Sequence, residues 1–357
     1  MRDAEYWAER AVNEVLMGER SVLEYEDALL QAYTIALREI QKDIESFFTR
    51  YANQHRISYS EARKRLTSNE LKQFQSFVNK WLADARDGKW STEYIKYLEK
   101  LVGAKYISRL EMLEAEVRYQ IELLEQHKHI DVTDLLSSNY IASYYDRAYT
   151  IAHGVDVAVR FDAITKSGVE AAVKSRWSHS NYSQKIWNDR DRLVRALSTI
   201  IPQSFSRGLS SNQLGDMIAK EMNASKTRSR TLARTEVNYI SNKADLDVYK
   251  IAGIEEYEYL ATLDSRTSDI CRSLDGSTFK VTQAQVGVNY PPMHPNCRST
   301  TVPKMDDEDA EERVARDENG KTIKVPRRMT QEEWINTYVP EEDREKLLEF
   351  RKKFYKI

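Results

Sequence analysis

The sequence predicts a mainly α-helical protein, with an elongated helical N-terminal region followed by a small α+β domain. All seven prolines lie at Pro202 or later, so the first 201 residues contain none. Only five of the eleven glycines fall in that first part. A proline costs roughly 3 kcal/mol in a helix interior, so its absence over such a length favours long helices. Apolar residues recur there at intervals of three or four, which is typical of one buried helix face.

The helices of the N-terminal region can be placed in order along the chain. The first is indicated by an apolar series at helical spacing: Leu29, Tyr33, Ala36, Ile40, Ile44 and Phe47. Thr67 and Glu70 have the spacing of a capping box, and Gly88 offers the following helix an end. A third apolar series predicts one helix over residues 93–126, about 50 Å long at about 1.5 Å per residue. Such a length indicates an elongated bundle or hairpin with a structural role.

The second half reads as α+β. One helix is expected to end near Pro202, a short one to follow around Leu214, and another to cover about residues 226–251. Residues 256–260 alternate charged and bulky side chains, and residues 278–281 follow a turn, so both are expected to be strands. The expected domains are therefore residues 1–184 (helical), 185–303 (α+β) and 304–357 (a charged extension).

Composition excludes several classes of protein. The net charge of −2 argues against a globally basic nucleic-acid coat, although local patches remain open. No stretch approaches the 18 or so consecutive apolar residues of a membrane span, and the first residues are charged, unlike a secretory signal. Two cysteines cannot build a disulfide scaffold, which favours a reducing compartment.

Both cysteines lie in one window that also contains a histidine. His294 and Cys297 are three residues apart in a proline-rich turn, and Cys271 precedes them. Thiolate and imidazole groups are zinc ligands, and a closed zinc site needs four of them. The fourth ligand would be Asp264, Asp269 or water. Two alternatives stay open, namely plain packing of two unreactive thiols and a Cys271–Cys297 disulfide.

A basic segment precedes this window. Lys220, Lys226, Arg228 and Arg230, together with Arg234, give residues 220–236 a net charge of +3. Such a cluster could contact DNA phosphates, and binding would then weaken with salt. The alternative is a solvated helix face with an internal ion pair.

Four short runs of sequence together carry a resemblance. Residues 233–236, 263–267, 271–276 and 291–298 resemble, in order and spacing, the Mu F-like phage head morphogenesis (minor head protein) domain, over about residues 185–303. Besides Cys271, His294 and Cys297, the residues of these runs that we expect to shape the site are Arg234, Thr235, Glu236, Arg266, Asp275, Gly276 and Arg298.

The resemblance implies a structural minor head protein of a double-stranded DNA phage or prophage. It implies portal, capsid or scaffold proteins as partners, contact with packaged DNA, and a place in the virion, in the capsid interior or at the portal vertex, after assembly in host cytoplasm. Within the domain, Cys271, His294 and Cys297 would staple the sheet, optionally with zinc, and Asp264 and Arg266 would fix the adjoining loop. Arg234 and Glu236 would tie the preceding helix to that loop.

A rival hypothesis is a zinc-dependent nuclease or peptidase. It would use zinc at Cys271, His294 and Cys297 and take Glu236 or Asp264 as general base. The remaining histidines are scattered and offer no second metal cluster, so we expect a protein that is not an enzyme.

Overall fold

The computed structural model describes residues 4–53, 56–88, 90–154, 164–262, 267–304, 315–316, 322–323, 336 and 341–354. The helices of the chain are α1 (Ala4–Tyr51), α2 (Tyr59–Ala62), α3 (Ser68–Asp87), α4 (Thr92–Val102), α5 (Arg109–Gly154), α6 (Lys166–Val173), α7 (Tyr182–Ser206), α8 (Ser211–Ala252), α9 (Asp269–Leu274) and α11 (Glu341–Phe354). The strands are β1 (Glu256–Leu260), β2 (Thr278–Lys280), β3 (Thr300–Lys304), β4 (Ala315–Arg316) and β5 (Thr322–Ile323). The expected fold class, mainly helical with a small α+β part, is confirmed.

The chain divides into two compact units that do not follow its linear order. The sheet unit comprises residues 1–27, 131–184 and 230–357, and the helical unit comprises residues 28–130 and 185–229. Helices α1, α5 and α8 each contribute residues to both units. Among the described residues, no helix is long and apolar enough to cross a membrane.

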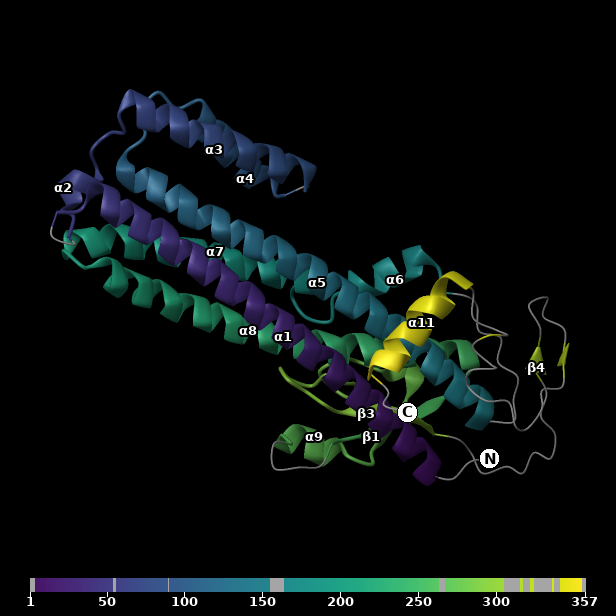
Figure 1. Cartoon of the computed structure of the whole chain (residues 1–357). Coiled ribbons are helices and arrows are strands. Elements are labelled where there is room, and N and C mark those ends of the chain that lie inside the picture. The colour runs from purple at the N-terminus through teal and green to yellow at the C-terminus, as the bar shows by residue number, and fades with distance from the viewer. Residues whose placement is uncertain are drawn as a thin grey trace. The chain divides into compact units, whose positions relative to one another are not determined.

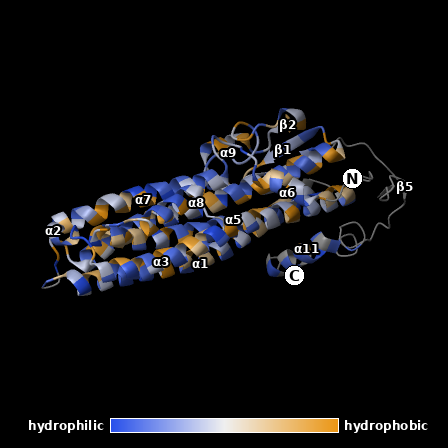
Figure 2. Cartoon of the chain, turned by 90° about the horizontal axis from the view of Figure 1, so that it is seen from above, coloured by the Kyte–Doolittle hydropathy of each residue, from blue (hydrophilic) through white to orange (hydrophobic). Residues whose placement is uncertain are grey.

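The helical unit is held by apolar faces at the predicted spacing. In both Figure 1 and Figure 2 its portions of α1, α5, α7 and α8 run side by side. In Figure 2, hydrophobic (orange) and hydrophilic (blue) residues alternate along each of them. All six residues of the first predicted stripe, from Leu29 to Phe47, are buried. Phe205 of α7 stacks on Phe48 of α1 with ring centroids 5.7 Å apart. The stripe therefore forms the core of this unit.

The helix ends show where local signals decided the structure. Thr67 and Glu70 form the predicted capping box of α3, and Gly88 is its C-cap. The single helix predicted over residues 93–126 is wrong, because α4 ends at Val102 and α5 begins at Arg109. A second capping box explains the break: Glu111 accepts a hydrogen bond from the backbone N–H of Ser108, and Ser108 Oγ accepts one from that of Glu111.

Two further helix boundaries differ from the prediction. Helix α7 does not end near Pro202 but contains it and ends at Ser206. The two helices predicted around Leu214 and over residues 226–251 are one helix, α8. No glycine or proline stands between Gly215 and Ala252 to interrupt it. Ile251, in the last turn of α8, is exposed.

The sheet unit contains a three-stranded antiparallel sheet in the order β2-β1-β3. The two predicted strands are present, and β3 is a strand that we did not predict. In β1, Tyr257 and Tyr259 are fully buried while the intervening Glu258 is partly exposed, as the alternation predicted. The sheet is joined to α8 because Asn238 donates a hydrogen bond to the carbonyl of Ser299 at 2.9 Å. This contact places the start of β3 beside α8.

Candidate metal centre and its domain

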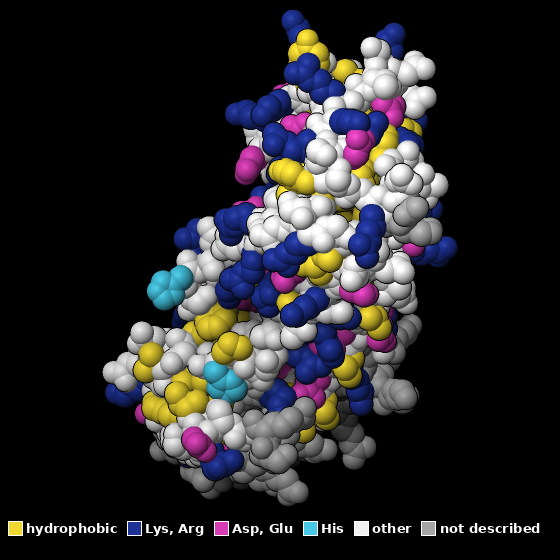
Figure 3. All heavy atoms as spheres, turned by 90° about the vertical axis from the view of Figure 1, so that its left-hand side faces the viewer, with side chains coloured by type: hydrophobic (Ala, Val, Ile, Leu, Met, Phe, Trp, Pro, Cys, Tyr) yellow, Lys and Arg dark blue, Asp and Glu magenta, His cyan; other side chains and the backbone are white. Residues whose placement is uncertain are grey.

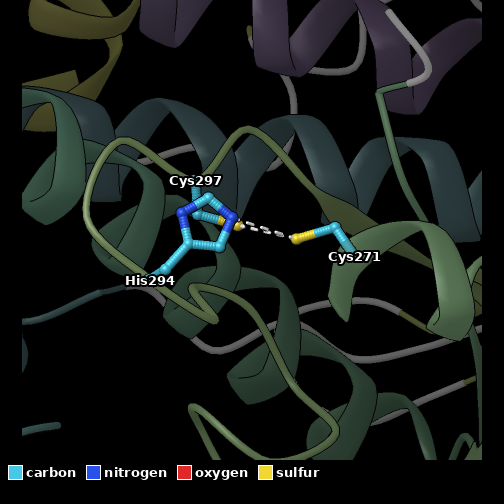
Figure 4. Close-up of side chains that lie close together, drawn as sticks. All are labelled: Cys271, His294 and Cys297. Carbon is cyan, nitrogen blue, oxygen red and sulfur yellow. Dashed lines mark hydrogen bonds between the residues drawn. The ribbon is translucent and has the colours of Figure 1, made fainter. Parts of the chain in front are cut away.

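The structure brings Cys271, His294 and Cys297 together in the sheet unit (Figure 4). Cys271 lies in the first turn of α9, where Ser268 is the N-cap and accepts a hydrogen bond from the backbone N–H of Cys271. His294 and Cys297 lie in the turn that leads into β3, and the backbone N–H of Cys297 donates to the carbonyl of His294 at 3.1 Å. A helix start and a tight turn thus position the three side chains.

The three donor atoms are within one ion's reach of one another. Cys271 Sγ is 3.3 Å from His294 Nε2 and 3.8 Å from Cys297 Sγ. A disulfide requires about 2.05 Å between the sulfurs, so the two thiols are free. All three donor atoms lie within 4.8 Å of one another.

These distances fit a tetrahedral zinc ion. With zinc–sulfur bonds of about 2.3 Å and a zinc–nitrogen bond of about 2.0 Å, the tetrahedral angle sets the sulfurs about 3.8 Å apart. The same geometry sets sulfur and nitrogen about 3.5 Å apart. Both cysteines are buried and the histidine is half-buried. The residues therefore suit zinc in donor type and in spacing.

The orientation of His294 is also fixed. Its Nδ1 lies 2.8 Å from the carbonyl oxygen of Pro295. Because a carbonyl oxygen only accepts, Nδ1 carries the proton, and Nε2 presents its lone pair to the sulfurs. Ser268 Oγ lies 2.8 Å from the same Nε2.

The two thiols have opposite pKa shifts. The hydrogen bond from Cys297 lowers the pKa of the Cys271 thiol well below its usual range, with further hydrogen bonds from Ser268, Ser299 and Tyr259. The same contact, together with burial, raises the pKa of the Cys297 thiol. Tyr259 donates its hydroxyl to Cys271 Sγ at 3.4 Å. The pair therefore holds its first negative charge on Cys271.

A small apolar cluster surrounds the sulfurs. It contains Tyr259 and Ala261 with the two cysteines, and Leu274, Phe279 and Met293 pack against it. Few apolar side chains contribute to this cluster, so it offers limited hydrophobic stabilisation. The side chains from α9, β1, β2 and the turn meet at this point.

Most of the other predicted motif residues serve the surrounding backbone. Thr235 Oγ1 accepts a hydrogen bond from the backbone N–H of Asn296 at 2.9 Å, which ties α8 to the turn between His294 and Cys297. Asp275 Oδ1 accepts from the backbone N–H of Ala261 at 2.8 Å. Gly276 has a φ of 72°, a conformation that favours glycine. The carbonyl of Arg298 accepts a hydrogen bond from the side-chain hydroxyl of Thr262.

Arg234 and Glu236 contact other elements. Arg234 Nε is 2.5 Å from Glu26 Oε1 of α1, within the sheet unit. Glu236 is 3% exposed, and both of its oxygens accept from Trp177 Nε1 at 3.3 Å. Asp264 and Arg266 lie outside the described residues, so the expected contact with their loop stays a prediction.

Part of the chain matches a known protein family. Residues 196–302 match the family model described as Phage Mu protein F like protein. This segment is a Mu F-like domain. The description names a phage protein, which agrees with the resemblance seen in the sequence. No curated protein and no solved structure matches the chain.

The basic residues of the predicted DNA-contact segment, which lies within the Mu F-like domain, differ in their contacts. Lys220 is exposed and Lys226 is half-buried. Arg228 forms an ion pair with Asp189 in the helical unit. Arg230 Nη2 is 2.6 Å from Glu26 Oε2 in the sheet unit. The two lysines are thus better placed for a phosphate than the two arginines.

A buried charge network linked to the Mu F-like domain was not predicted. Arg147 of α5 is fully buried and lies 2.5 Å from Glu14 of α1 and 2.8 Å from Asp245 of α8. Its Nη2 also donates to the carbonyl of Thr301 in β3 at 3.3 Å. By helical spacing, Asp245 lies on the same side of α8 as Arg234. The partner in α5 lies among tyrosines and alanines, which gave no sign of a buried charge.

Proposed function

We propose that the chain is a structural minor head protein of a double-stranded DNA phage or prophage, acting in head morphogenesis near the portal. The single observation that carries this proposal is the Mu F-like domain at residues 196–302. The protein would be made in host cytoplasm and retained in the virion, in the capsid interior or at the portal vertex.

The arrangement of acids around the metal centre supports a structural role. The cluster found among the described residues consists of Cys271, His294 and Cys297 and includes no carboxylate. Glu236, one candidate general base, is buried and accepts hydrogen bonds from Trp177. A general base must reach a substrate or its water, and a carboxylate in this position is shielded from both. No observation favours the hydrolase over the head protein.

An exposed apolar face on α1 supports contact with portal, capsid or scaffold proteins. Val12, Leu16, Leu23 and Leu30 lie on one face of the helix and are 41–54% exposed. The three leucines are seven residues apart, a spacing that suits packing against another helix. Contiguous exposed apolar side chains of this kind mark interaction sites in soluble proteins. We propose the portal as the partner of this face.

Segregation of charge supports a local contact with packaged DNA. The helical unit has 25 Lys and Arg residues against 18 Asp and Glu, whereas the sheet unit has 29 against 38. On the face drawn in Figure 3, dark blue Lys and Arg side chains predominate over magenta acids. The near-zero total therefore combines a basic unit and an acidic one. Phosphate contacts would fall on the helical unit, with Lys220 and Lys226 among them.

Deletion and complementation test the role in head assembly. Deleting the gene from its phage or prophage should abolish infectious particles while capsid and portal proteins are still made. Supplying the wild-type chain in trans should restore the yield. Normal yields of infectious, DNA-filled particles without the chain would contradict the proposal.

The α1 face can be tested separately with charged substitutions. Leu16→Glu, Leu23→Glu and Leu30→Glu together should reduce copurification with the portal protein at least tenfold. The same variant should keep the unfolding free energy within about 0.5 kcal/mol, since the side chains are exposed. Gln31→Glu, at an exposed polar position of the same helix, is the matched control and should leave copurification unchanged. Full retention of the portal by the triple variant would rule out this face.

DNA contact predicts a specific salt dependence. Each phosphate contact contributes a slope of about −0.9 to the logarithm of affinity against the logarithm of salt concentration. Replacing Lys220 and Lys226 by Gln should weaken DNA binding and reduce the slope by up to about 2. Lys304→Gln, in β3 of the sheet unit, is the control and should leave the slope unchanged. An identical slope in the double variant would argue against these contacts.

A further inference from the structure

We propose that Cys271, His294 and Cys297 bind one zinc ion that fastens α9 to the turn entering β3, with the fourth ligand position beside Ser268. This site is independent of the head role, because it rests on the geometry of three side chains. It would act as a structural staple in the sheet unit.

The spacing of the donor atoms suits a zinc ion. The sulfur–sulfur distance of 3.8 Å is the separation that a tetrahedral zinc ion imposes, and the sulfur–nitrogen distance of 3.3 Å is close to the separation of about 3.5 Å that such an ion sets between sulfur and nitrogen. Hydrogen bonding of Nδ1 to the carbonyl of Pro295 selects the tautomer whose Nε2 can bind metal. Two thiolates with an imidazole favour zinc over magnesium or calcium, which prefer oxygen.

The surrounding contacts resemble those that support metal ligands. Tyr259 donates a hydrogen bond to Cys271 Sγ, and the N–H of Asn296 is held by Thr235 of α8. Such second contacts orient ligands and are a common part of zinc sites. Among the described residues, few apolar side chains surround the sulfurs, so a metal bond between segments would add stability to this small core.

The fourth position is defined by Ser268. Its Oγ lies 2.8 Å from His294 Nε2 and also caps α9 at Cys271. Ser268 is half-buried, so solvent can reach this side of the cluster. A hydroxyl is a weak zinc ligand compared with a thiolate, and a water molecule would complete the wild-type site. Cysteine at residue 268 would instead supply a third thiolate.

Zinc content of the full-length chain tests the proposal. Protein purified under reducing conditions and equilibrated with zinc should contain about one zinc ion per chain and protect both thiols from alkylation. Cys271→Ser and Cys297→Ser should each reduce the zinc content at least tenfold. Ser268→Ala should retain it, and Ser268→Cys should slow zinc release to a chelator at least tenfold.

Wild-type protein provides a second readout that no folding defect can confuse. Cobalt should replace zinc and give the visible absorption bands and thiolate charge-transfer band of tetrahedral coordination. Folded wild-type chain that binds no zinc, with both thiols freely alkylated in its presence, would overturn the proposal. Detection of a Cys271–Cys297 disulfide in protein purified under the same conditions would also overturn it. An unchanged release rate in Ser268→Cys would overturn the position assigned to the fourth ligand.

Discussion

The two units bury charge in different ways. In the sheet unit, Arg147 of α5 is enclosed between Glu14 of α1 and Asp245 of α8. In the helical unit, Lys128 pairs with Glu125, three residues earlier in α5, at 2.7 Å. The first network joins three helices that are distant in the sequence, whereas the closest partner of Lys128 lies within its own helix and Asp189 of α7 is farther away, at 3.9 Å.

The difference shows what each unit needs from the rest of the chain. Burial raises the pKa of both Glu14 and Asp245, although Arg147 opposes this shift. Burial disfavours the ammonium of Lys128, but Glu125, Tyr33 and Asp189 together outweigh burial and raise the pKa of Lys128. Asp245 belongs to the Mu F-like domain, while Glu14 and Arg147 lie outside it. The domain therefore depends for a buried charge on helices that precede it.

Removing the central cation of each buried network should give the largest difference in stability between the two units. Arg147→Met leaves two buried carboxylates without their counter-ion, and we expect it to cost about 3–5 kcal/mol of unfolding free energy. Lys128→Met leaves Glu125, which can take up a proton, and should cost about 2 kcal/mol. Hydrogen exchange of amides in the two units measures each loss locally.

Neutralising the partners controls for cavity effects. Arg147→Met combined with Glu14→Gln and Asp245→Asn should recover at least half of the loss, because no unpaired carboxylate remains. A larger cost for Lys128→Met than for Arg147→Met would contradict the comparison.

A carboxyl group of the helical unit should make that unit sensitive to pH. Burial, with a further contribution from Asp43, raises the pKa of Glu116 to about 8. A raised pKa means that the folded state binds a proton more tightly. The contribution of the protonated Glu116 to the free energy of unfolding is therefore complete below about pH 4.5 and is lost as pH rises through about 8. Glutamine cannot ionise, so the free energy of unfolding of Glu116→Gln should rise relative to that of wild type by roughly 1–3 kcal/mol as pH increases from 5 to 9.

Urea unfolding at several pH values measures this difference. Glu93→Gln, at an exposed position in the same unit, is the control and should show no comparable pH-dependent gain. If Glu116→Gln is equally stable relative to wild type at pH 5 and pH 9, the raised pKa is contradicted.

Much of the fold could be predicted because it depends on local signals. The stripe from Leu29 to Phe47 is buried as its spacing predicted, and Thr67 caps α3. The break before Arg109 also had a local signal, since Ser108 and Glu111 have capping-box spacing, but the apolar series across it was more prominent. Strand β3 contains Pro303 and only one aliphatic residue, so its pairing with β1 decides its structure.

The site could be predicted in part for a similar reason. Cys271, His294 and Cys297 were recognised by residue type, and the structure brings them together. The roles of Ser268 and Tyr259 depend on how α9 and β1 pack, which spacing does not reveal. Glu14 and Arg147 lie over 90 residues from Asp245, and no periodic pattern connects them.

Helix caps should give the smallest difference between the units. In the helical unit, Thr67 and Glu70 satisfy each other's backbone N–H groups, whereas in the sheet unit Thr165 accepts from Gly168. Thr67→Ala should cost about 1–1.5 kcal/mol and Thr165→Ala about 0.5–1 kcal/mol. Hydrogen exchange in the first turns of α3 and α6 checks both values, with Thr67→Ser and Thr165→Ser as controls that keep the hydroxyl. An equal or reversed order would show that the reciprocal bond of Glu70 adds nothing.

The most direct test of the head-protein assignment is the protein content of purified phage heads. Quantitative mass spectrometry of DNA-filled heads should detect this chain at a fixed ratio to the portal protein, after washing at high salt removes loosely bound proteins. Heads that contain portal and capsid proteins but lack this chain, at every stage of assembly from prohead to virion, would contradict the account.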